Sequence, residues 1–278
     1  MEHGQSCPVS KLDKLLLATD RSSFSEGAIN AAITFAKHCS SKLSIMTVVE
    51  KNPEYETAGA ELLQKDTEEA ARYLASLKVR ALENIPSCET ILRRGDNASG
   101  LIVKEAAQKE IDMIVVGRRG RSGLEKVFLG SAAAKVIGHA PCKVLVVPRE
   151  AKIGFKNILI ATDGSEHARI AATESIEIAK RCGSHLIVIS VVLSEDGKEK
   201  SKENADEVVL ASHEAGIYAE SIVHVGKPRE VIVATAKGMG ADLIVMGAYG
   251  KTGLRRLLMG STTEKVIGLA DCAILVAK

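Results

Sequence analysis

The chain has no tryptophan, and only four tyrosines and four phenylalanines occur in its 278 residues. So few aromatic side chains leave little material for the stacking platforms that bind single-stranded nucleic acids. The formal net charge is only +2, with both signs interspersed, which argues against a dedicated nucleic-acid surface. Uncharged apolar runs stay well short of the roughly 18 residues that a membrane span needs, and the N-terminus lacks the apolar core of a signal peptide. We therefore expect a cytoplasmic protein that binds neither nucleic acid nor membrane.

The six cysteines include no C-x-x-C pair, which gives little support to redox or zinc chemistry. Cys7 belongs to a polar stretch, residues 1–12, that we expect to form an N-terminal tail. Four others lie next to or within apolar segments and are expected to act as small buried hydrophobes: Cys39, Cys142, Cys182 and Cys272. No metal site is predicted.

The chain is built from two copies of one sequence pattern. The segment "KLLLATDRS" that begins at Lys14 returns as "NILIATDGS" from Asn157, at an offset of 143 residues. Residues 113–148 return as residues 243–278 at an offset of 130, with 16 of the 36 aligned positions identical. The second copy is therefore shorter by 143 − 130 = 13 residues.

Each copy alternates short apolar runs with helical patterns, and in the first copy the runs stand at about 14–19, 43–49, 88–93, 111–117 and 143–148. Apolar runs bounded by polar residues are typical of strands that helices cover on both faces. Five strands alternating with helices predict an α/β fold, with a five-stranded, parallel, doubly wound sheet in each copy. We place the first domain at residues 13–150 and the second at 151–278. The linker between them is short, so the two domains must sit close together.

The two copies share a glycine pattern after the fourth apolar run: Gly117, Gly120, Gly130 and Ser131 in the first, and Gly247, Gly250, Gly260 and Ser261 in the second. In a doubly wound sheet, ligands bind beyond the carboxyl ends of the strands. The first N–H groups of a helix lack backbone partners and carry the positive end of the helix dipole, so a glycine loop ahead of a helix start suits phosphate. Glycines are also common in ordinary turns. The same spacing in two otherwise diverged copies favours phosphate binding.

An aspartate ends the first apolar run of both copies, Asp20 in "ATDRSS" and Asp163 in "ATDGSE". Its carboxylate is expected at the same edge of the sheet as the glycines, where it would accept from a ribose hydroxyl or reach a metal ion on phosphates. The alternative is an N-cap for the helix that follows. Both roles can coexist.

The pattern G-x-x-G, nine residues, then G-[ST] resembles the ATP-binding signature of universal stress proteins. Both glycine patterns fit it, and the "ATDxS" and "VV" ends of the first two strands belong to the same pattern. The resemblance covers almost the whole chain, as two tandem domains. It implies a strand order of 3-2-1-4-5 in each, with an adenine nucleotide (ATP, ADP or AMP, with or without Mg²⁺) between strands 1 and 4. It also implies that the last strands of the two domains pair with each other.

The resemblance further implies roles for single residues. Asp20 and Asp163 would face the ribose and the phosphates, and Val48 and Val191 would meet adenine through backbone groups. The glycines and serines of the pattern would wrap the ribose and phosphates: Gly117, Gly120, Gly130 and Ser131, with Gly247, Gly250, Gly260 and Ser261. The loops themselves differ, because the second reads "AYGKT" where the first reads "RRGRS". The arginines of the first loop either pair with phosphates or point to solvent: Arg118, Arg119 and Arg121.

We expect an adenine-nucleotide-binding stress-response or regulatory protein with a site in each half. No histidine falls on another at the repeat offsets and no paired nucleophile and base stand out, so no catalytic residue is predicted. The alternative is a slow ATP hydrolase or phosphotransferase in which Asp20 or Asp163 holds a metal ion on the phosphates. An unidentified protein partner and assembly into a homodimer are further expectations.

Overall fold

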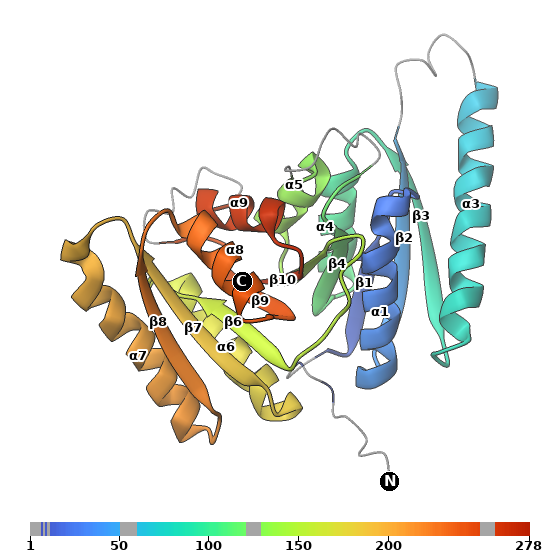
Figure 1. The fold of residues 1–278 in the computed structure, drawn as a ribbon. Helices are drawn as coiled ribbons and strands as arrows, with labels where there is room; N and C mark the ends of the chain where they lie inside the picture. Colours follow the sequence, from blue (N-terminus) through green and yellow to red (C-terminus); the bar gives the residue numbers. More distant parts are fainter. Residues whose placement is uncertain (1–6, 8, 10–11, 51–59, 121–128, 251–258) are drawn as a thin grey trace.

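The computed structural model of the chain describes residues 7, 9, 12–50, 60–120, 129–250 and 259–278. Each copy of the repeat forms an α/β half, and the strands of both halves join into one sheet (Figure 1). The strands of the first half coincide closely with the ranges that its apolar runs predict.

The first half contains β1 (Lys14–Ala18), the short 3-10 helix η1 (Ser23–Ser25), α1 (Glu26–Cys39), β2 (Lys42–Glu50), α3 (Ala60–Leu82), β3 (Cys88–Gly95), α4 (Ala98–Gln108), β4 (Met113–Gly117), α5 (Ser131–His139) and β5 (Lys143–Val147). The second half repeats this order with β6 (Asn157–Ala161), α6 (Glu166–Cys182), β7 (His185–Val192), η2 (Glu195–Gly197), α7 (Lys198–Glu214), β8 (Ala219–Val225), α8 (Pro228–Gly238), β9 (Leu243–Gly247), α9 (Ser261–Leu269) and β10 (Ala273–Ala277).

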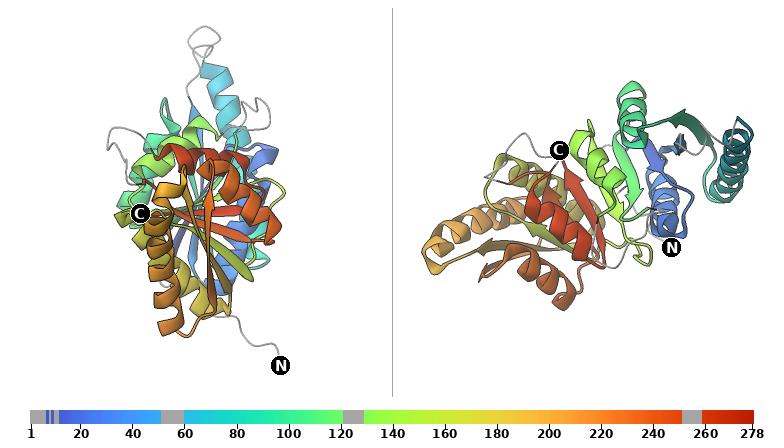
Figure 2. Two further views of the ribbon diagram at one scale, coloured as in Figure 1. Left: turned by 60° about the vertical axis from the view of Figure 1, so that its left-hand side comes forward. Right: turned by 90° about the horizontal axis from the view of Figure 1, so that it is seen from above.

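The ten strands lie in the order β3-β2-β1-β4-β5-β10-β9-β6-β7-β8. Within each half this is the order 3-2-1-4-5, so the predicted fold class is confirmed. Neighbouring strands run parallel except at the centre, where β5 and β10 pair antiparallel with Leu145 opposite Leu275. Seen from above, these two strands meet in the middle of the molecule (Figure 2). The predicted pairing of the last strands is therefore also confirmed, and it turns two five-stranded sheets into one mixed sheet.

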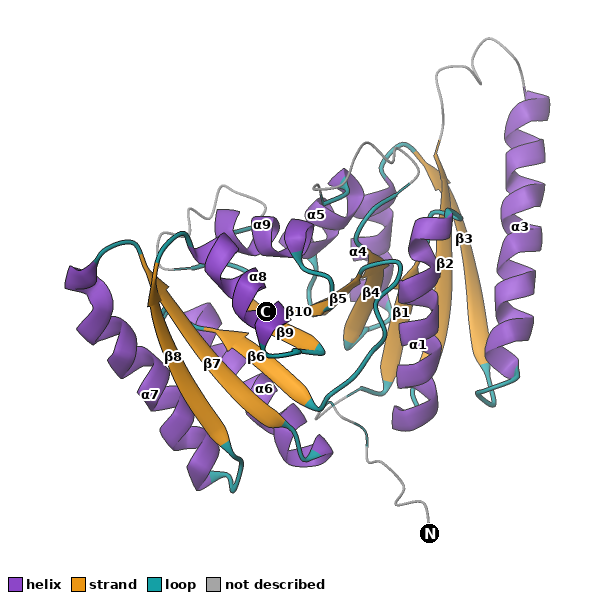
Figure 3. Ribbon diagram, in the orientation of Figure 1, coloured by secondary structure: helices purple, strands orange, loops and turns teal. Residues whose placement is uncertain are grey.

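Helices cover both faces of the sheet (Figure 3). The helices α1, α3, α6 and α7 share one apolar core with the sheet, and α4, α5, α8 and α9 share the other. Alternate strand residues supply the two cores, as Leu15 and Leu16 do on β1, and both of these side chains are 0% exposed. Burial of such a side chain contributes about 1.5–3 kcal/mol, which explains why the strands read as unbroken apolar runs. Among the described residues, no helix has the length and apolar character required to cross a bilayer.

Part of the predicted N-terminal tail packs with the first half. Val9 and Leu12 are 1% and 3% exposed and belong to the core that contains α1. Cys7 is disulfide-bonded to Cys39, the last residue of α1. The expectation that Cys39 is simply a buried hydrophobe is therefore wrong. The disulfide could not be predicted, because Cys7 lies in a segment that carries no recognisable structural pattern.

The remaining cysteines are thiols that lie at least partly within the protein: Cys88, Cys142, Cys182 and Cys272. Burial disfavours the charged thiolate and raises the pKa of each to about 11. These four thiols are protonated at neutral pH and are poor nucleophiles. For Cys142, Cys182 and Cys272, which are half-buried, this agrees with the expected role of small hydrophobes, whereas no role was predicted for Cys88.

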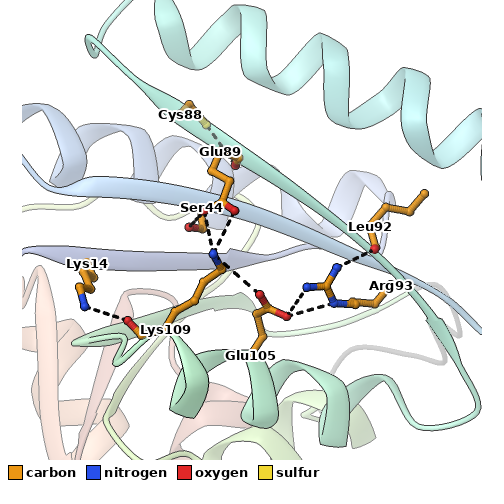
Figure 4. Close-up of polar contacts among 8 residues, drawn as sticks. All are labelled: Lys14, Ser44, Cys88, Glu89, Leu92, Arg93, Glu105 and Lys109. Carbon is orange, nitrogen blue, oxygen red and sulfur yellow. Dashed lines mark hydrogen bonds and ion pairs between the residues drawn. The ribbon is translucent and has the colours of Figure 1, made fainter.

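A polar network fastens the outer strand β3 to α4 (Figure 4). The carboxylate of Glu105, only 6% exposed, accepts from the Nε of Arg93 at 3.0 Å and lies 2.8 Å from its Nη2. Lys109, the C-cap residue of α4 and one turn beyond Glu105, donates to both carboxylate oxygens of Glu89 at 3.0 Å. The network is specific to the first half, because the repeat places Thr235 at the position of Glu105.

We expect Arg93→Met to destabilise the chain by about 1–3 kcal/mol, because it leaves the buried Glu105 carboxylate without its two-pronged partner. The urea midpoint of unfolding measures this change. Arg94→Met is the matched control, since Arg94 is the next residue of β3 and is exposed. Equal losses of stability in the two variants would contradict a specific role for the Arg93 pair.

Candidate functional site

A cleft of about 550 Å³ lies at the carboxyl ends of β1 and β4 in the first half. The chain leaves β1 into α1 on one face of the sheet and enters β4 from α4 on the other, which is where doubly wound sheets bind ligands. The volume falls within the roughly 300–1,000 Å³ of small-molecule sites. The cleft brings together every residue predicted for the first site: Asp20, Val48, Gly117, Gly120, Gly130 and Ser131.

Asp20 is held in a tight turn directly after β1. Its Oδ1 accepts from the backbone N–H of Ser22 at 3.1 Å and from the hydroxyls of Ser22 and Ser25 at 2.7 and 2.9 Å. Asp163 repeats the turn, with its Oδ1 accepting from the N–H of Ser165 at 3.0 Å. Ser165, not the aspartate, caps α6 through a hydrogen bond from Ala168 N. In the first half Ser22 and Ser25 hold the N-cap positions of η1 and α1. The alternative of an N-cap is therefore wrong, because each helix begins at least two residues later than an aspartate cap requires.

Gly120 and Gly250 lie directly against these aspartates. A Cβ on Gly120 would come within 3.0 Å of the Oδ2 of Asp20, and one on Gly250 within 2.7 Å of the Oδ2 of Asp163. Neither glycine has the positive φ that would demand glycine for conformational reasons. What the position requires is space, because any side chain here would displace the carboxylate.

The start of α5 packs on the same loop. Gly130 occupies the N-cap position, and its N–H donates to the carbonyl of Arg118 at 2.9 Å. The second half repeats the contact, with Gly260 capping α9 and donating to Ala248 at 2.9 Å. Ser131 and Ser261 therefore occupy the first helical position, not the cap, and both are exposed. Each helix thus presents an exposed hydroxyl beside N–H groups that have no partner within the helix.

Val48 and Val191 occupy the equivalent place near the end of β2 and β7. Val48 lines the cleft with a half-buried side chain, and its backbone lies beside Arg93 of β3. Val191 has the same half-buried setting beside His224 of β8.

In each half a threonine that is absent from the predicted site residues supports the turn after the first strand. Thr19 and Thr162 are 6% exposed, and each accepts, at 3.2 Å, from the N–H two residues on. The carbonyl of each accepts a hydroxyl from the neighbouring strand at 2.8 Å, donated by Thr47 and by Ser190. The signal was present in the repeated "ATD", where the threonine recurs with the aspartate.

The side chains around the turns differ between the halves. Arg21 has φ +69° and forms a two-pronged pair with Asp66 at 2.6 and 3.1 Å, and both line the first cleft. In the second half Gly164 takes its place, with φ +76°. A Cβ there would lie 2.4 Å from Asn204, whose side chain donates to the carbonyl of Asp163 at 3.4 Å.

The glycine loops differ in the same way. Arg119 lines the first cleft, and its Nε is buried without a hydrogen-bond partner among the described residues. Its counterpart is Tyr249, whose ring centre lies 5.2 Å from that of His167. Arg118 does not face the cleft but donates to a carbonyl of the second half, at Ala270. Arg121, the third arginine of this loop, lies outside the described residues.

Carboxylates are the other charged groups of the first cleft, which is lined by Glu50 as well as by Asp20 and Asp66. The described residues contain no group of three or more side chains placed to hold a metal ion by themselves. A cation at this site would therefore share its coordination with a bound ligand, such as phosphate oxygens.

Comparison with known proteins agrees with this architecture. The model of the universal stress protein family matches residues 11–148 and again residues 154–278. The chain belongs to the universal stress protein family. It carries two domains of this family in tandem, joined through their last strands.

Members of the universal stress protein family match the chain both in sequence and in structure. Universal stress protein MJ0531 of Methanocaldococcus jannaschii is 38% identical over 140 residues, which are 45% of this chain and 82% of that protein. A universal stress protein from Archaeoglobus fulgidus matches 96% of this chain and 99% of its own, with 25% identity and a TM-score of 0.73. Another from Archaeoglobus fulgidus, in complex with dAMP, is 23% identical over 46% of this chain and all of its own, with a TM-score of 0.39.

We expect Gly120→Val to abolish ligand binding in the first half, because its side chain would displace Asp20 and fill the cleft. Gly250→Val should do the same in the second half through Asp163. Calorimetry with ADP should then count one site in each single variant instead of two, and none in the double variant. Two full sites in a folded Gly120→Val protein would contradict the assignment.

Proposed function

We propose that this universal stress protein is an adenine-nucleotide-binding regulatory protein with one site in each half. The observation that carries the proposal is the convergence of six residues on one cleft in the first half, with the same local contacts repeated in the second. Asp20 and Asp163 would accept from ribose hydroxyls or hold Mg²⁺ on the phosphates. The phosphates would lie at the N-termini of α5 and α9, beside Ser131 and Ser261.

Adenine would lie at the other end of each site, beside the backbone of Val48 or Val191. The first cleft supports this placement, because its lining includes apolar side chains such as Met46 and Ile102 as well as the residues of the glycine loop. Apolar side chains suit a flat base, and the first N–H groups of α5 and α9, which have no partner within the helix, suit phosphate. The binding groups at the phosphate end are mainly backbone atoms, so divergence of the side chains leaves them intact.

Nucleotide hydrolysis is the second candidate function. The three carboxylates of the first cleft favour it, because a metal ion shared with phosphates is common in phosphoryl transfer. The described lining of this cleft includes neither histidine nor lysine, which are frequent acid and base groups. We therefore place binding and regulation first.

The cytoplasm is the proposed location. A disulfide such as Cys7–Cys39 is rare in that reducing compartment, so the thiol content of protein taken directly from cells tests the location.

The function is tested by identifying what the protein binds. Mass spectrometry of ligand released from freshly purified, denatured protein should detect an adenine nucleotide, and calorimetry with ADP should give two sites per chain. Asp20→Ala combined with Asp163→Ala should weaken both. Absence of adenine nucleotide binding at millimolar ligand would refute the proposal, whereas ATP turnover that disappears in this double variant would favour the hydrolase.

Arg119 should make the first site sensitive to the number of phosphates. With the second site blocked by Gly250→Val, we expect Arg119→Met to weaken ATP binding by about 1.5–3 kcal/mol, or roughly 10- to 150-fold, because a charge-assisted hydrogen bond is lost. AMP binding should change little. The matched variant is Tyr249→Leu with the first site blocked by Gly120→Val, for which ATP and AMP should respond alike. Equal losses for ATP and AMP in Arg119→Met would argue that the arginine only supports the loop.

A further inference from the structure

Arg118 joins the glycine loop of the first half to a helix of the second. Its backbone belongs to the first site, since its carbonyl accepts from Gly130 N at the start of α5. Its side chain is half-buried and donates to the carbonyl of Ala270, at the C-terminal end of α9. Helix α9 begins at Gly260 and Ser261 in the second site. One helix of nine residues, about 13 Å long, therefore spans from the second site to the loop of the first.

Lys278 forms the reciprocal connection. Its Nζ donates to the carbonyl of Gly138, near the C-terminal end of α5, at 3.2 Å. The same Nζ lies 5.9 Å from the ring centre of Tyr249, which belongs to the glycine loop of the second half. Helix α5 begins at Ser131, directly after its cap Gly130, and so spans from the first site to a cation that contacts the loop of the second.

The antiparallel pairing of β5 with β10 explains both connections. It places the carboxyl end of each strand beside the amino end of the other, and α5 and α9 end just before those amino ends. The glycine loops are tied to the carboxyl ends, because Arg118 N donates to Val147 at 3.1 Å and Ala248 N to Ala277 at 3.2 Å. A loop of one half thus meets the end of a helix from the other half.

Both cations are well placed for a strong interaction. The last carbonyls of a helix lack N–H partners within it and carry the negative end of its dipole, so a cation there is favourable. Burial lowers the pKa of both Arg118 and Lys278, because it removes water from the cations, and the carbonyls at the helix ends offset part of that cost.

We propose that Arg118 and Lys278 couple the two nucleotide sites, so that a nucleotide in one half raises the affinity of the other. The inference rests on the proposed function, since it concerns the regulation of those sites. A nucleotide beside Gly120 and Ser131 would hold Arg118 in place and thereby fix the C-terminal end of α9. The second nucleotide then meets a helix whose far end is already held, so its binding costs less entropy.

Helices α9 and α5 also differ in how firmly they are attached to the sheet. In the second half, Thr263 of α9 also donates to the carbonyl of Gly247 at 3.0 Å, while the repeat places Ala133 at this position of α5. A displacement of α9 is therefore transmitted to the end of β9 through a direct hydrogen bond. Arg118 acts on this connected unit, which makes it the residue to test first.

The experiment measures ADP binding to the full chain by calorimetry. Gly250→Val and Gly120→Val give the affinity of the first and the second site alone. We expect the second ADP to bind wild-type protein about fivefold or more tightly than the single-site values predict, the lower end of typical coupling. Arg118→Met should remove this excess, and Arg118→Lys, which keeps a charged donor, should retain most of it. Arg119→Met is the control in the same loop: it should weaken the first site yet leave the coupling factor unchanged.

The outcomes are distinct. Cooperative binding that Arg118→Met removes and Arg118→Lys retains supports the coupling. Two independent sites in the wild-type protein, or undiminished cooperativity in Arg118→Met, overturns it while leaving the proposed function intact. A weaker first site with an unchanged coupling factor in Arg118→Met assigns the arginine a local role and also overturns it. Absence of ADP binding refutes the proposed function, and the coupling with it.

Discussion

The antiparallel pairing of β5 with β10 joins two edges that would otherwise expose unpaired backbone groups and apolar side chains. Each half is a five-stranded sheet whose last strand is short and almost entirely buried in the complete molecule. Once these strands pair, the two apolar cores extend across all ten strands, and neither half has a free inner edge. The outer edges, β3 and β8, remain, and on β3 a charged network to α4 occupies the surface beside the strand (Figure 4).

This pairing also decides which loops of the two halves meet. Because the strands run in opposite directions, the glycine loop of one half lies beside the end of α5 or α9 of the other. A parallel arrangement would place like ends together and separate these groups. The same geometry that buries the apolar edges therefore brings each candidate nucleotide site into contact with a helix that starts in the other.

Within each site, the contacts that recur in both halves are mostly those of the backbone. The aspartate accepts from an N–H two residues on, the cap glycine donates to the loop, and the second glycine leaves room for the carboxylate. The side chains that surround these contacts differ, as Arg119 and Tyr249 do. A phosphate site made of N–H groups tolerates such changes, since the groups that bind are present in every residue. The two halves can therefore keep one kind of ligand and still differ in affinity and in sensitivity to charge.

The amino-acid sequence by itself determined the fold of each half and predicted the position of its candidate site. Strand periodicity, the repeat and the G-x-x-G spacing are local signals, and the carboxyl ends of parallel strands meet at one edge whatever the loops contain. These local signals could not predict why Gly120 must be a glycine, because the space that it leaves for Asp20 depends on two segments 100 residues apart. Tertiary structure alone decided the partner of Arg118, 152 residues away, and that of Cys7, 32 residues away. Neither contact has a local pattern, since each arises where surfaces formed by separate segments come together.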